Sequence, residues 1–370
     1  MPALPRLLRE MLSLPTAAFV ETAVADYVRD TCGRFPHVTL RRDRHGNLLV
    51  RYRHRPPRRT PLVFCAHMDH PGFVALRMTK PGRLRAAFRG WVEPEYFANQ
   101  AVRFWHDGRW IRGEIRGITR VARIYRMIGR TARPEEVEIE VPEPIAANAP
   151  GMWDLPGPEL RDGRVYARGC DDVAGCAAML ALLERLSRKS AAADVYCLFT
   201  RAEEVGFVGA LAACESGTVP RRLPVISIET SKALPTAQVG AGPVLRVGDK
   251  SSVFTPELTA FCDRVGAELA RKRPRTFAYQ RRLMDGGTCE ATAFHAFGYA
   301  AAGICVPLGN YHNMNTETRR IDSEYVSFAD WGRMVCWFEA LTLDRDGYRT
   351  DVHPHRAGLE KRLAEWRHLL

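Results

Sequence analysis

Two neighbouring carboxylates, Asp171 and Asp172, open an apolar stretch whose hydrophobic side chains recur at helical spacing. Acidic side chains are favoured at a helix N-terminus, because unpaired backbone N–H groups and the positive end of the helix dipole lie there. On this pair alone, a helix cap is therefore the better interpretation. Other acids and histidines along the chain favour a different interpretation of this pair.

These residues occupy the same kind of position, at the end of an expected strand or the start of an expected helix. They are His67 and Asp69 in CAHMDH, Glu203 and Glu204 in RAEEVG, Glu229 in ISIET and His312 in NYHNM. Imidazole and carboxylate ligands in this combination suit a pair of Zn²⁺ or Co²⁺ ions, and suit Mn²⁺ less well. The set predicts a two-metal site with nitrogen and oxygen ligands.

The residue types also indicate separate roles within that site. Asp171 has two oxygens and can reach over both metals, whereas Asp172 is expected to be structural. The side chains of Glu203 and Glu204 diverge, so one can bind metal while the other acts as general base on a metal-activated water. Glu229 ends an apolar strand, where a charge without a partner would be costly, so a metal or an arginine must neutralise it.

Asp69 is two residues from His67 at a strand end, so both side chains point to the same face. An acid in that place can accept the second N–H of a metal-bound imidazole and fix its tautomer. Asp69 is therefore expected to support His67.

The elements that must position these residues alternate between strand and helix. Strands are expected at 61–66, 194–200, 224–229 and 301–307, and helices at 7–30, 171–189, 206–215, 255–272, 289–297 and 323–343. A hairpin joins 38–40 to 47–52 with Gly46 at the turn. This rhythm predicts an α/β fold, a mostly parallel sheet sandwiched by helices, with function at the carboxyl ends of its strands.

The stretch from Gly72 to Gly163 has a different character. It contains no convincing helix but many short alternating segments, with a hairpin signal at Trp105–Trp110. We therefore expect an inserted small β-barrel domain. The chain divides into a catalytic domain (1–72 and 164–345), an all-β insertion (73–163) and a tail helix (346–370). A docking or oligomer contact is one possible role for the tail.

Composition narrows the function classes. No run approaches the roughly 18 apolar residues of a membrane span, and the ten cysteines show no framework spacing. We therefore expect a cytoplasmic protein without membrane partners. The net charge of +12 invites a nucleic-acid interpretation, but the only dense basic run is Arg51–Arg59 and no nucleic-acid motif frames it.

The motifs AHMDHPGF, DGRVYARGCDDVAGC, EEVGFVGA, GGTCEATAF and YHNM, in this order, resemble the dinuclear-zinc aminopeptidases related to tetrahedral aminopeptidase, glutamyl aminopeptidase and the cellulase-M-like metallopeptidases. The resemblance runs from LLREMLSLP to about residue 345. It implies the zinc-exopeptidase (phosphorylase/hydrolase-like) fold and homo-oligomers, often dodecamers, in which the β insertion makes contacts. It also implies a cis peptide between Asp171 and Asp172.

The resemblance assigns a role to each site residue. His67, Asp171 and Glu229 would hold one metal, and Asp171, Glu204 and His312 the other. Glu203 would be the catalytic base, with Asp69 behind His67. The interval from His67 to Asp171, 104 residues (171 − 67), accommodates the insertion. Related N-acyl amino acid hydrolases carry their extra domain in the later interval, so its position favours the tetrahedral-aminopeptidase type.

Two positions depart from the family. Glu229 stands where the family usually has Asp, which lengthens this ligand by one methylene. The segment Gly287-Thr288-Cys289-Glu290-Ala291 replaces the family's Gly-Thr-Asp-Ala, which puts the wall of the substrate pocket in question.

The expected function is hydrolysis of N-terminal residues from short peptides by a water that two divalent ions activate, Zn²⁺ first and Co²⁺ or Mn²⁺ as alternatives. Two other functions stay open: hydrolysis of an N-acyl amino acid on the same metals, and a catalytically silent scaffold. The preferred N-terminal residue is not readable from the sequence.

Overall fold

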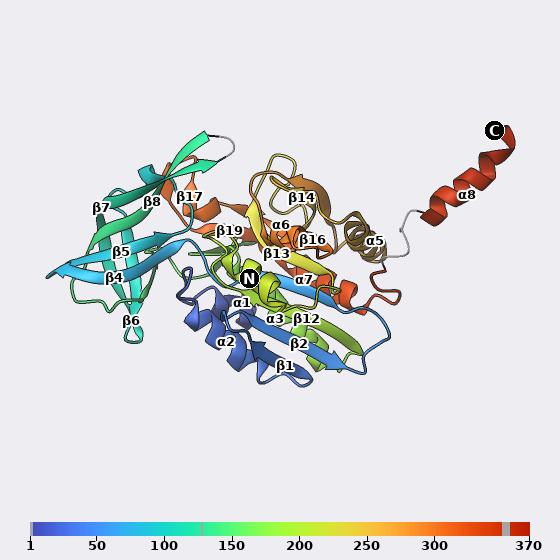
Figure 1. The fold of residues 1–370 in the computed structure, drawn as a ribbon, viewed down its shortest axis with the longest axis horizontal. Helices are drawn as coiled ribbons and strands as arrows, with labels where there is room; N and C mark the ends of the chain where they lie inside the picture. Colours follow the sequence, from blue (N-terminus) through green and yellow to red (C-terminus); the bar gives the residue numbers. More distant parts are fainter. Residues whose placement is uncertain (1–2, 127–128, 350–355) are drawn as a thin grey trace.

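The computed structural model describes residues 3–126, 129–349 and 356–370. Figure 1 shows a large sheet with helices on both faces, a β-barrel at one end of it and a separate C-terminal helix at the other. The expected α/β class with an inserted barrel is confirmed.

The large sheet has 11 strands. Nine lie in the order β1 (Val38–Arg42), β2 (Leu48–His54), β12 (Ala193–Thr200), β3 (Leu62–His67), β13 (Val225–Lys232), β16 (Ala301–Gly309), β19 (Glu324–Ser327), β11 (Arg164–Ala167) and β10 (Glu159–Arg161). Beside this path, β14 (Val244–Asp249) pairs with β16, and β15 (Gln280–Met284) pairs with β14.

Strands β12, β3, β13 and β16 form the centre of the sheet and are parallel, while most of the outer pairs are antiparallel. Every residue of β3 is buried. Phe64 packs in the hydrophobic cluster on one face, and Val63 and Cys65 pack in the cluster on the other. This two-sided burial explains the unbroken apolar run in the sequence.

Helices cover both faces. The larger cluster contains residues of α1 (Arg6–Met11), α2 (Thr22–Cys32), α3 (Val173–Arg188), α5 (Pro256–Lys272) and α7 (Phe328–Leu343). The opposite cluster contains residues of α4 (Val208–Ser216) and α6 (Glu290–Ala296). The parallel strands therefore end at an edge that lies between two helical layers.

The continuous helix expected over 7–30 is wrong, because the chain leaves the helix after Met11 and resumes it at Thr22. Pro15 has no N–H to donate, and Phe19 has a φ of 73°, outside the helical region. Hydrogen bonds to distant residues stabilise the break: the Thr16 hydroxyl donates to the Met68 carbonyl at 2.7 Å. Tertiary contacts here override helical periodicity.

The helix expected over 323–343 begins later than predicted, at Phe328. The preceding residues form β19, which pairs with β16 and β11. Ser327 then caps α7, because its hydroxyl oxygen accepts the backbone N–H of Asp330 at 3.2 Å. Pairing with two strands that are distant in sequence decides the conformation of this segment.

Six strands close the barrel: β4 (Gly72–Lys80), β5 (Arg83–Arg89), β8 (Gly129–Glu140), β7 (Arg109–Arg126), β6 (Ala101–His106) and β9 (Pro150–Trp153). The predicted hairpin joins β6 to β7, with Trp105 opposite Trp110. Its two turn residues, Asp107 and Gly108, both have positive φ, as a type I′ turn requires. The division of the chain into domains stays a prediction.

The remaining elements are short. They are the strand pair β17 (Met314–Asn315) and β18 (Arg320–Ile321) and the 3₁₀ helices η1 (Pro94–Tyr96), η2 (Tyr311–Asn313) and η3 (Arg367–Leu369).

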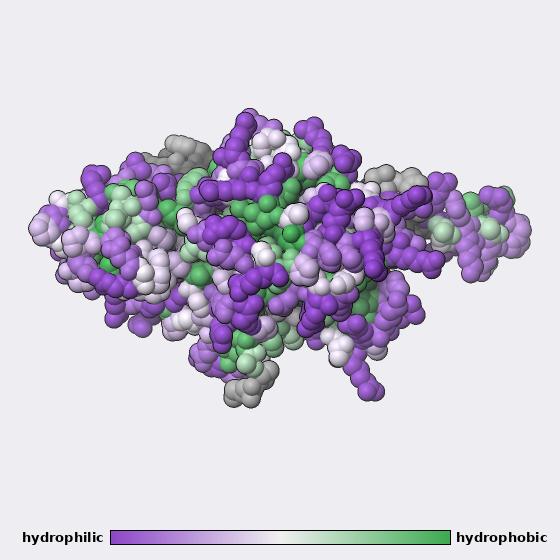
Figure 2. All heavy atoms as spheres, turned by 90° about the horizontal axis from the view of Figure 1, so that it is seen from below, coloured by the Kyte–Doolittle hydropathy of each residue, from purple (hydrophilic) through white to green (hydrophobic). Residues whose placement is uncertain are grey.

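The tail forms helix α8 (Arg356–Trp366), in agreement with the expected helix, and none of its residues is buried. Figure 2 shows apolar atoms on this separate lobe. The exposed apolar side chains are Leu359, Leu363, Trp366, Leu369 and Leu370. Within the described ranges, no helix combines the length and the apolar character that a membrane span needs.

Candidate metal centre

The residues predicted as ligands come together at the carboxyl edge of the parallel strands. They are His67 at the end of β3, Glu229 in β13, Glu203 and Glu204 after β12, Asp171 just before α3 and His312 in η2. All are nearly buried. Parallel strands deliver their ends to one edge, so segments that are far apart in the sequence meet there.

One group consists of His67, Asp171 and Glu229, whose potential ligand atoms all lie within 4.8 Å of one another. His67 Nε2 is 3.5 Å from Asp171 Oδ1 and 3.8 Å from Glu229 Oε2. One nitrogen and two carboxylate oxygens therefore face a common point.

A second group consists of Asp171, Glu204 and His312, within the same limit. His312 Nε2 is 3.4 Å from Glu204 Oε2 and 3.8 Å from Asp171 Oδ2. Asp171 thus presents Oδ1 to the first group and Oδ2 to the second. This is the arrangement that a carboxylate shared by two ions requires.

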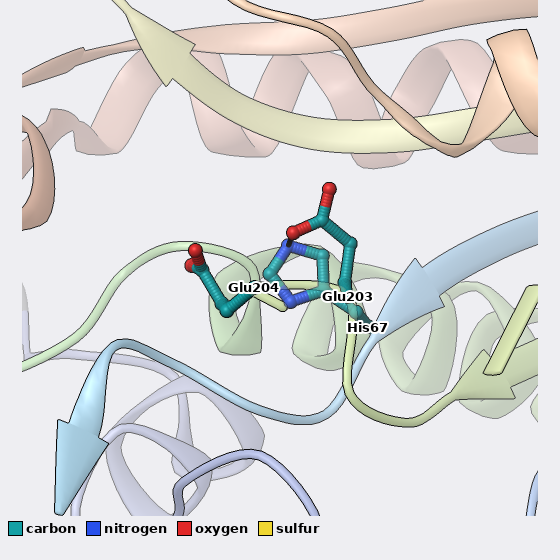
Figure 3. A group of neighbouring side chains, drawn as sticks. All are labelled: His67, Glu203 and Glu204. Carbon is teal, nitrogen blue, oxygen red and sulfur yellow. Dashed lines mark ion pairs between the residues drawn. The ribbon is translucent and has the colours of Figure 1, made fainter. Parts of the chain in front are cut away.

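Glu203 lies beside both groups. Figure 3 shows its carboxylate next to the His67 ring and the carboxylate of Glu204 on the other side of that ring; the ligand atoms of the three residues all lie within 4.8 Å of one another. Glu203 Oε2 is 4.0 Å from His67 Nε2. The two neighbouring glutamates therefore diverge and can serve different functions.

The electrostatics of this edge favour a bound cation. Burial raises the pKa of Glu203 and Glu204 well above the ordinary value, and neighbouring carboxylates add to the shift. Burial also raises the pKa of Glu229. Glu204 Oε1 and Glu229 Oε1 are buried and accept no hydrogen bond. Buried oxygens without donors fit a site that divalent cations complete, so the residues present suit the predicted metals.

In both predicted ligand histidines, the second ring nitrogen lies within hydrogen-bond distance of a backbone carbonyl oxygen. His312 Nδ1 is 2.6 Å from the Trp91 carbonyl oxygen, and His67 Nδ1 is 3.1 Å from that of Asp69. These contacts leave both Nε2 atoms facing the carboxylates, as metal-ligating histidines require.

Asp69 has a further contact that the sequence did not suggest. Its carboxylate lies 3.6 Å from His67 Nδ1 and accepts the backbone N–H groups of Glu203 and Glu204, at 3.0 and 3.1 Å. Asp69 thereby positions the glutamate pair relative to His67.

Asp172 does not cap α3, although it stands at the N-cap position, because its side chain makes no capping hydrogen bond. Both carboxylate oxygens are buried without a partner, and burial raises its pKa well above the ordinary value. An added Cβ at Gly175 would lie 2.3 Å from Asp172 Oδ2, so only glycine leaves room for this side chain. The peptide bond between Asp171 and Asp172 is cis.

Glu324 supports the site, and sequence reasoning did not find it. Its buried carboxylate accepts the backbone N–H groups of Cys170 at 2.6 Å, Asp171 at 3.1 Å and His312 at 2.8 Å. It therefore links the two segments that carry the ligands of the second group. The expected helix over 323–343 concealed it, because a glutamate in the first turn of a helix is ordinary.

His70 and Asn313 form a second support that the sequence reasoning missed. His70 Nδ1 is 2.7 Å from the Asp171 carbonyl oxygen, and its Nε2 is 3.0 Å from Asn313 Oδ1. Each lies inside a predicted ligand motif, His70 in CAHMDH and Asn313 in NYHNM, so the available signal was proximity in sequence to His67 and His312.

The basic run Arg51–Arg59 is partly engaged inside the fold. Arg51 makes two hydrogen bonds to Asp194, at 2.8 and 2.7 Å. Arg59 donates to the backbone carbonyls of Thr342 and Asp344. Arg51 thus connects β2 to β12, and Arg59 connects the segment after β2 to the end of α7.

Comparison with known proteins agrees with this architecture. A protein of Acetivibrio thermocellus named "Putative aminopeptidase" is 23% identical over 264 residues, which cover 68% of this chain and 76% of that protein. An aminopeptidase from the archaeon Desulfurococcus kamchatkensis has the same fold, with a TM-score of 0.72 and 24% identity over 91% of this chain and 93% of that one. The TET1 peptidase of Pyrococcus horikoshii has a TM-score of 0.72 and 20% identity over 91% and 98%.

One protein-family model matches most of the chain. The sequence model of M42 glutamyl aminopeptidases matches residues 46–326, a range that begins in the turn before β2 and ends in β19. The match includes the barrel and every predicted ligand. This protein therefore belongs to the M42 glutamyl aminopeptidase family of peptidases.

Proposed function

We propose that this chain is a two-metal aminopeptidase that releases the N-terminal residue from short peptides. The observation that supports this proposal best is the sharing of Asp171 between two ligand groups that lie side by side. Family membership supports the peptidase class. We expect Zn²⁺ in both positions, with Co²⁺ or Mn²⁺ as alternatives.

In this proposal His67, Asp171 and Glu229 hold one ion, and Asp171, Glu204 and His312 hold the other. Two such ions, when bound, supply Lewis acidity that lowers the pKa of a water and stabilises the oxyanion of an attacked carbonyl. Glu229 lies inside β13, and its Oε2 lies 3.8 Å from His67 Nε2.

Glu203 acts as the general base. Its carboxylate takes a proton from the attacking water and later gives that proton to the leaving amine. Its Oε2 lies 4.0 Å from His67 Nε2, beside both ligand groups, where an attacking water would be activated. Asp69 positions Glu203 through the backbone N–H of that residue.

The chain is further proposed to be cytoplasmic and to assemble as a homo-oligomer. The TET1 peptidase of Pyrococcus horikoshii can assemble into a tetrahedron or a large octahedral shell, and its fold is similar to this one. The size of the assembly, with a dodecamer as one candidate, is measurable by light scattering on the purified chain.

The test is residue release by metal-stripped protein from a panel of short peptides, with Zn²⁺, Co²⁺ or Mn²⁺ added back, beside N-acetylated copies of the same peptides. Cleavage of free N-termini alone, restored by metal, is the expected result. Cleavage of the acetylated copies alone would assign a deacylase instead. No cleavage with any of the three metals, while two ions are bound per chain, would assign a scaffold.

A further inference from the structure

The segment after β12 carries both neighbouring glutamates of the metal centre, and side chains from distant segments hold its backbone. This glutamate segment, residues 201–204, lies between β12 and α4, outside any helix or strand. Each of its four backbone N–H groups donates to a side-chain oxygen. The acceptors are Asn47 Oδ1 for Arg201 at 3.1 Å, Glu21 Oε1 for Ala202 at 3.0 Å, and the two Asp69 oxygens for Glu203 and Glu204 at 3.0 and 3.1 Å. Contacts with remote parts of the chain therefore determine the path of this segment.

Glu21 is an acceptor that has no role in the proposed chemistry. It stands at the N-cap position of α2, but its side chain makes no capping hydrogen bond. Its carboxylate is buried and accepts three N–H groups: the backbone N–H of Ala202 at 3.0 Å, that of Phe19 at 2.8 Å, and Nε of Arg201 at 2.7 Å. Hydrogen bonds to an ionised carboxylate are stronger than those between neutral groups. Glu21 therefore fixes the two residues that directly precede Glu203.

Ala202 has a backbone conformation that needs this support. Its φ is 51°, in the left-handed region that favours glycine. Such a conformation is costly for a residue with a side chain and persists only where the surroundings enforce it. Two hydrogen bonds do so: the Ala202 N–H donates to Glu21, and the Ala202 carbonyl oxygen accepts the backbone N–H of Val208 at 3.1 Å. The conformation of Ala202 in turn determines how the chain enters Glu203.

Arg201 connects the same acid to two further backbone groups. Its Nη2 donates to the Phe19 carbonyl oxygen at 2.7 Å, and its Nη1 donates to that of His45 at 3.0 Å. Gly46 permits this approach, because a Cβ there would lie 2.8 Å from Arg201 Nη1. The ion pair supplies the opposite charge that a buried carboxylate such as Glu21 needs. It also ties the glutamate segment to the hairpin between β1 and β2.

The irregular stretch between α1 and α2, residues 12–21, also contacts the other segments that carry ligands. The Thr16 hydroxyl donates to the carbonyl oxygen of Met68, the residue after the β3 histidine, at 2.7 Å. The Ser13 carbonyl oxygen accepts Nη2 of Arg168, three residues before the shared aspartate, at 3.0 Å. The break in the first expected helix thus places one stretch of chain against three segments of the metal centre.

We propose that Glu21 is a positioning residue for the general base: it holds the glutamate segment so that the Glu203 carboxylate lies beside both ligand groups. The inference rests on the proposed aminopeptidase function. Asp69 fixes the backbone N–H groups of the two glutamates themselves, and Glu21 fixes the two residues that lead into them. Glu21 acts through Glu203 and not on the substrate.

The experiment compares Glu21→Gln with the unmodified full chain, both loaded with Zn²⁺, on the short peptide that the unmodified chain cleaves fastest. Glutamine keeps the shape of the side chain but has one acceptor oxygen in place of two, so it cannot serve all three donors. We expect kcat per bound metal ion to fall about 10- to 100-fold, the usual loss for a supporting residue. KM should change little, because the substrate does not contact Glu21.

A double-mutant cycle separates positioning of the base from a general loss of structure. In the Glu203→Gln background, Glu21→Gln should lower kcat little further, because no base is left to position. Asp194→Asn is the matched control. It removes another mostly buried acid that pairs with an arginine, Arg51 at 2.7 Å, but it lies near the start of β12, at the other end from the glutamate segment. It should leave kcat unchanged, whatever its effect on the melting temperature.

Hydrogen exchange supplies a readout that does not depend on activity. The backbone amides of residues 201–204 should exchange faster in metal-loaded Glu21→Gln than in the unmodified chain or in Asp194→Asn. If Glu21→Gln does not fold, Arg201→Gln takes its place with the same expectations, because it removes the cation that holds the Glu21 carboxylate from a partly exposed position.

The proposal is overturned if a folded variant keeps its kcat or keeps the exchange rates of residues 201–204. It is also overturned if Glu21→Gln lowers kcat by the same factor with and without the Glu203 carboxyl group, because the effect would then not act through the base. Failure of the aminopeptidase function is distinguishable: the unmodified chain would cleave no peptide, while hydrogen exchange would still report whether Glu21 holds the glutamate segment.

Discussion

The acidic residues of the barrel and those of the sheet edge have opposite surroundings. In the barrel, Glu136 pairs with Arg85 at 3.3 Å, and Glu143 pairs with Arg109 at 2.6 Å. At the sheet edge, Glu204 and Glu229 each keep a buried oxygen that no donor reaches. Glutamates thus have arginine partners in one region, whereas in the other they keep an oxygen that accepts no hydrogen bond.

Strand arrangement explains the difference. Neighbouring antiparallel strands place side chains directly opposite one another, so Glu140 on β8 meets Arg83 on β5, at 2.9 Å, at the barrel surface. Parallel strands instead deliver side chains from distant segments to one buried edge. Acids that converge there repel one another, and cations bound from outside the chain would relieve that repulsion.

The two regions also differ in what stabilises them. The barrel has its own hydrophobic cluster, in which the rings of Phe73 and Trp153 lie 4.9 Å apart and those of Phe88 and Phe97 also lie 4.9 Å apart. Barrel stability should therefore depend on packing, and the stability of the sheet edge on bound cations. Four predictions test this contrast.

The largest effect is expected from Glu203→Gln, which should reduce kcat by about 10²- to 10⁴-fold, the usual contribution of a general base. Stability should not fall, because an amide of the same shape replaces a carboxyl group whose ionised form is disfavoured by burial. Kinetics, metal content and thermal unfolding of the same preparation check this.

The matched control is Glu143→Gln on the barrel, whose exposed ion pair contributes little. It should leave both kcat and the melting temperature nearly unchanged. If the Glu203→Gln variant binds less metal but keeps its activity per bound metal ion, Glu203 is a metal ligand and not the base.

Truncation of the barrel core should have the next largest effect. Trp153 is 1% exposed, so Trp153→Ala should lower the free energy of unfolding by about 3–5 kcal/mol, measured by urea titration with metal present. Trp366→Ala on α8 is the control, because that ring is 55% exposed and its loss should change stability little. Equal effects would mean that the barrel is not stabilised by its aromatic cluster.

Metal addition should stabilise the protein through the sheet edge. At free Zn²⁺ of 100 times the dissociation constant, one ion adds about 2.7 kcal/mol to the free energy of unfolding. Stripped protein should therefore melt at a lower temperature than loaded protein, and Glu204→Gln should shrink the difference. An identical melting temperature with and without metal would contradict the cation-dependent edge.

The smallest of the four effects is expected from Asp69→Asn. An amide has one acceptor oxygen, so one of the two N–H groups of the glutamate pair loses its partner. Loss of such a supporting residue typically costs about 10- to 100-fold in activity or metal affinity. Unchanged kcat and metal affinity would remove Asp69 from the positioning role.

Local patterns made much of the fold predictable. The apolar run of β3 and the hairpin around Gly46 are visible because burial and turn geometry act on neighbouring residues. The two helix errors, over 7–30 and 323–343, occurred where distant strands or hydrogen bonds compete with helical periodicity. Periodicity alone carries no information about such partners.

The sequence by itself determined which residue types could bind metal and in which order they occur, because imidazole and carboxylate chemistry is a property of single residues. Only the tertiary structure decided that Asp171 faces both groups and that Asp69 and Glu324 hold backbone N–H groups near them. These relations depend on strand pairing across many residues, and no local pattern encodes them.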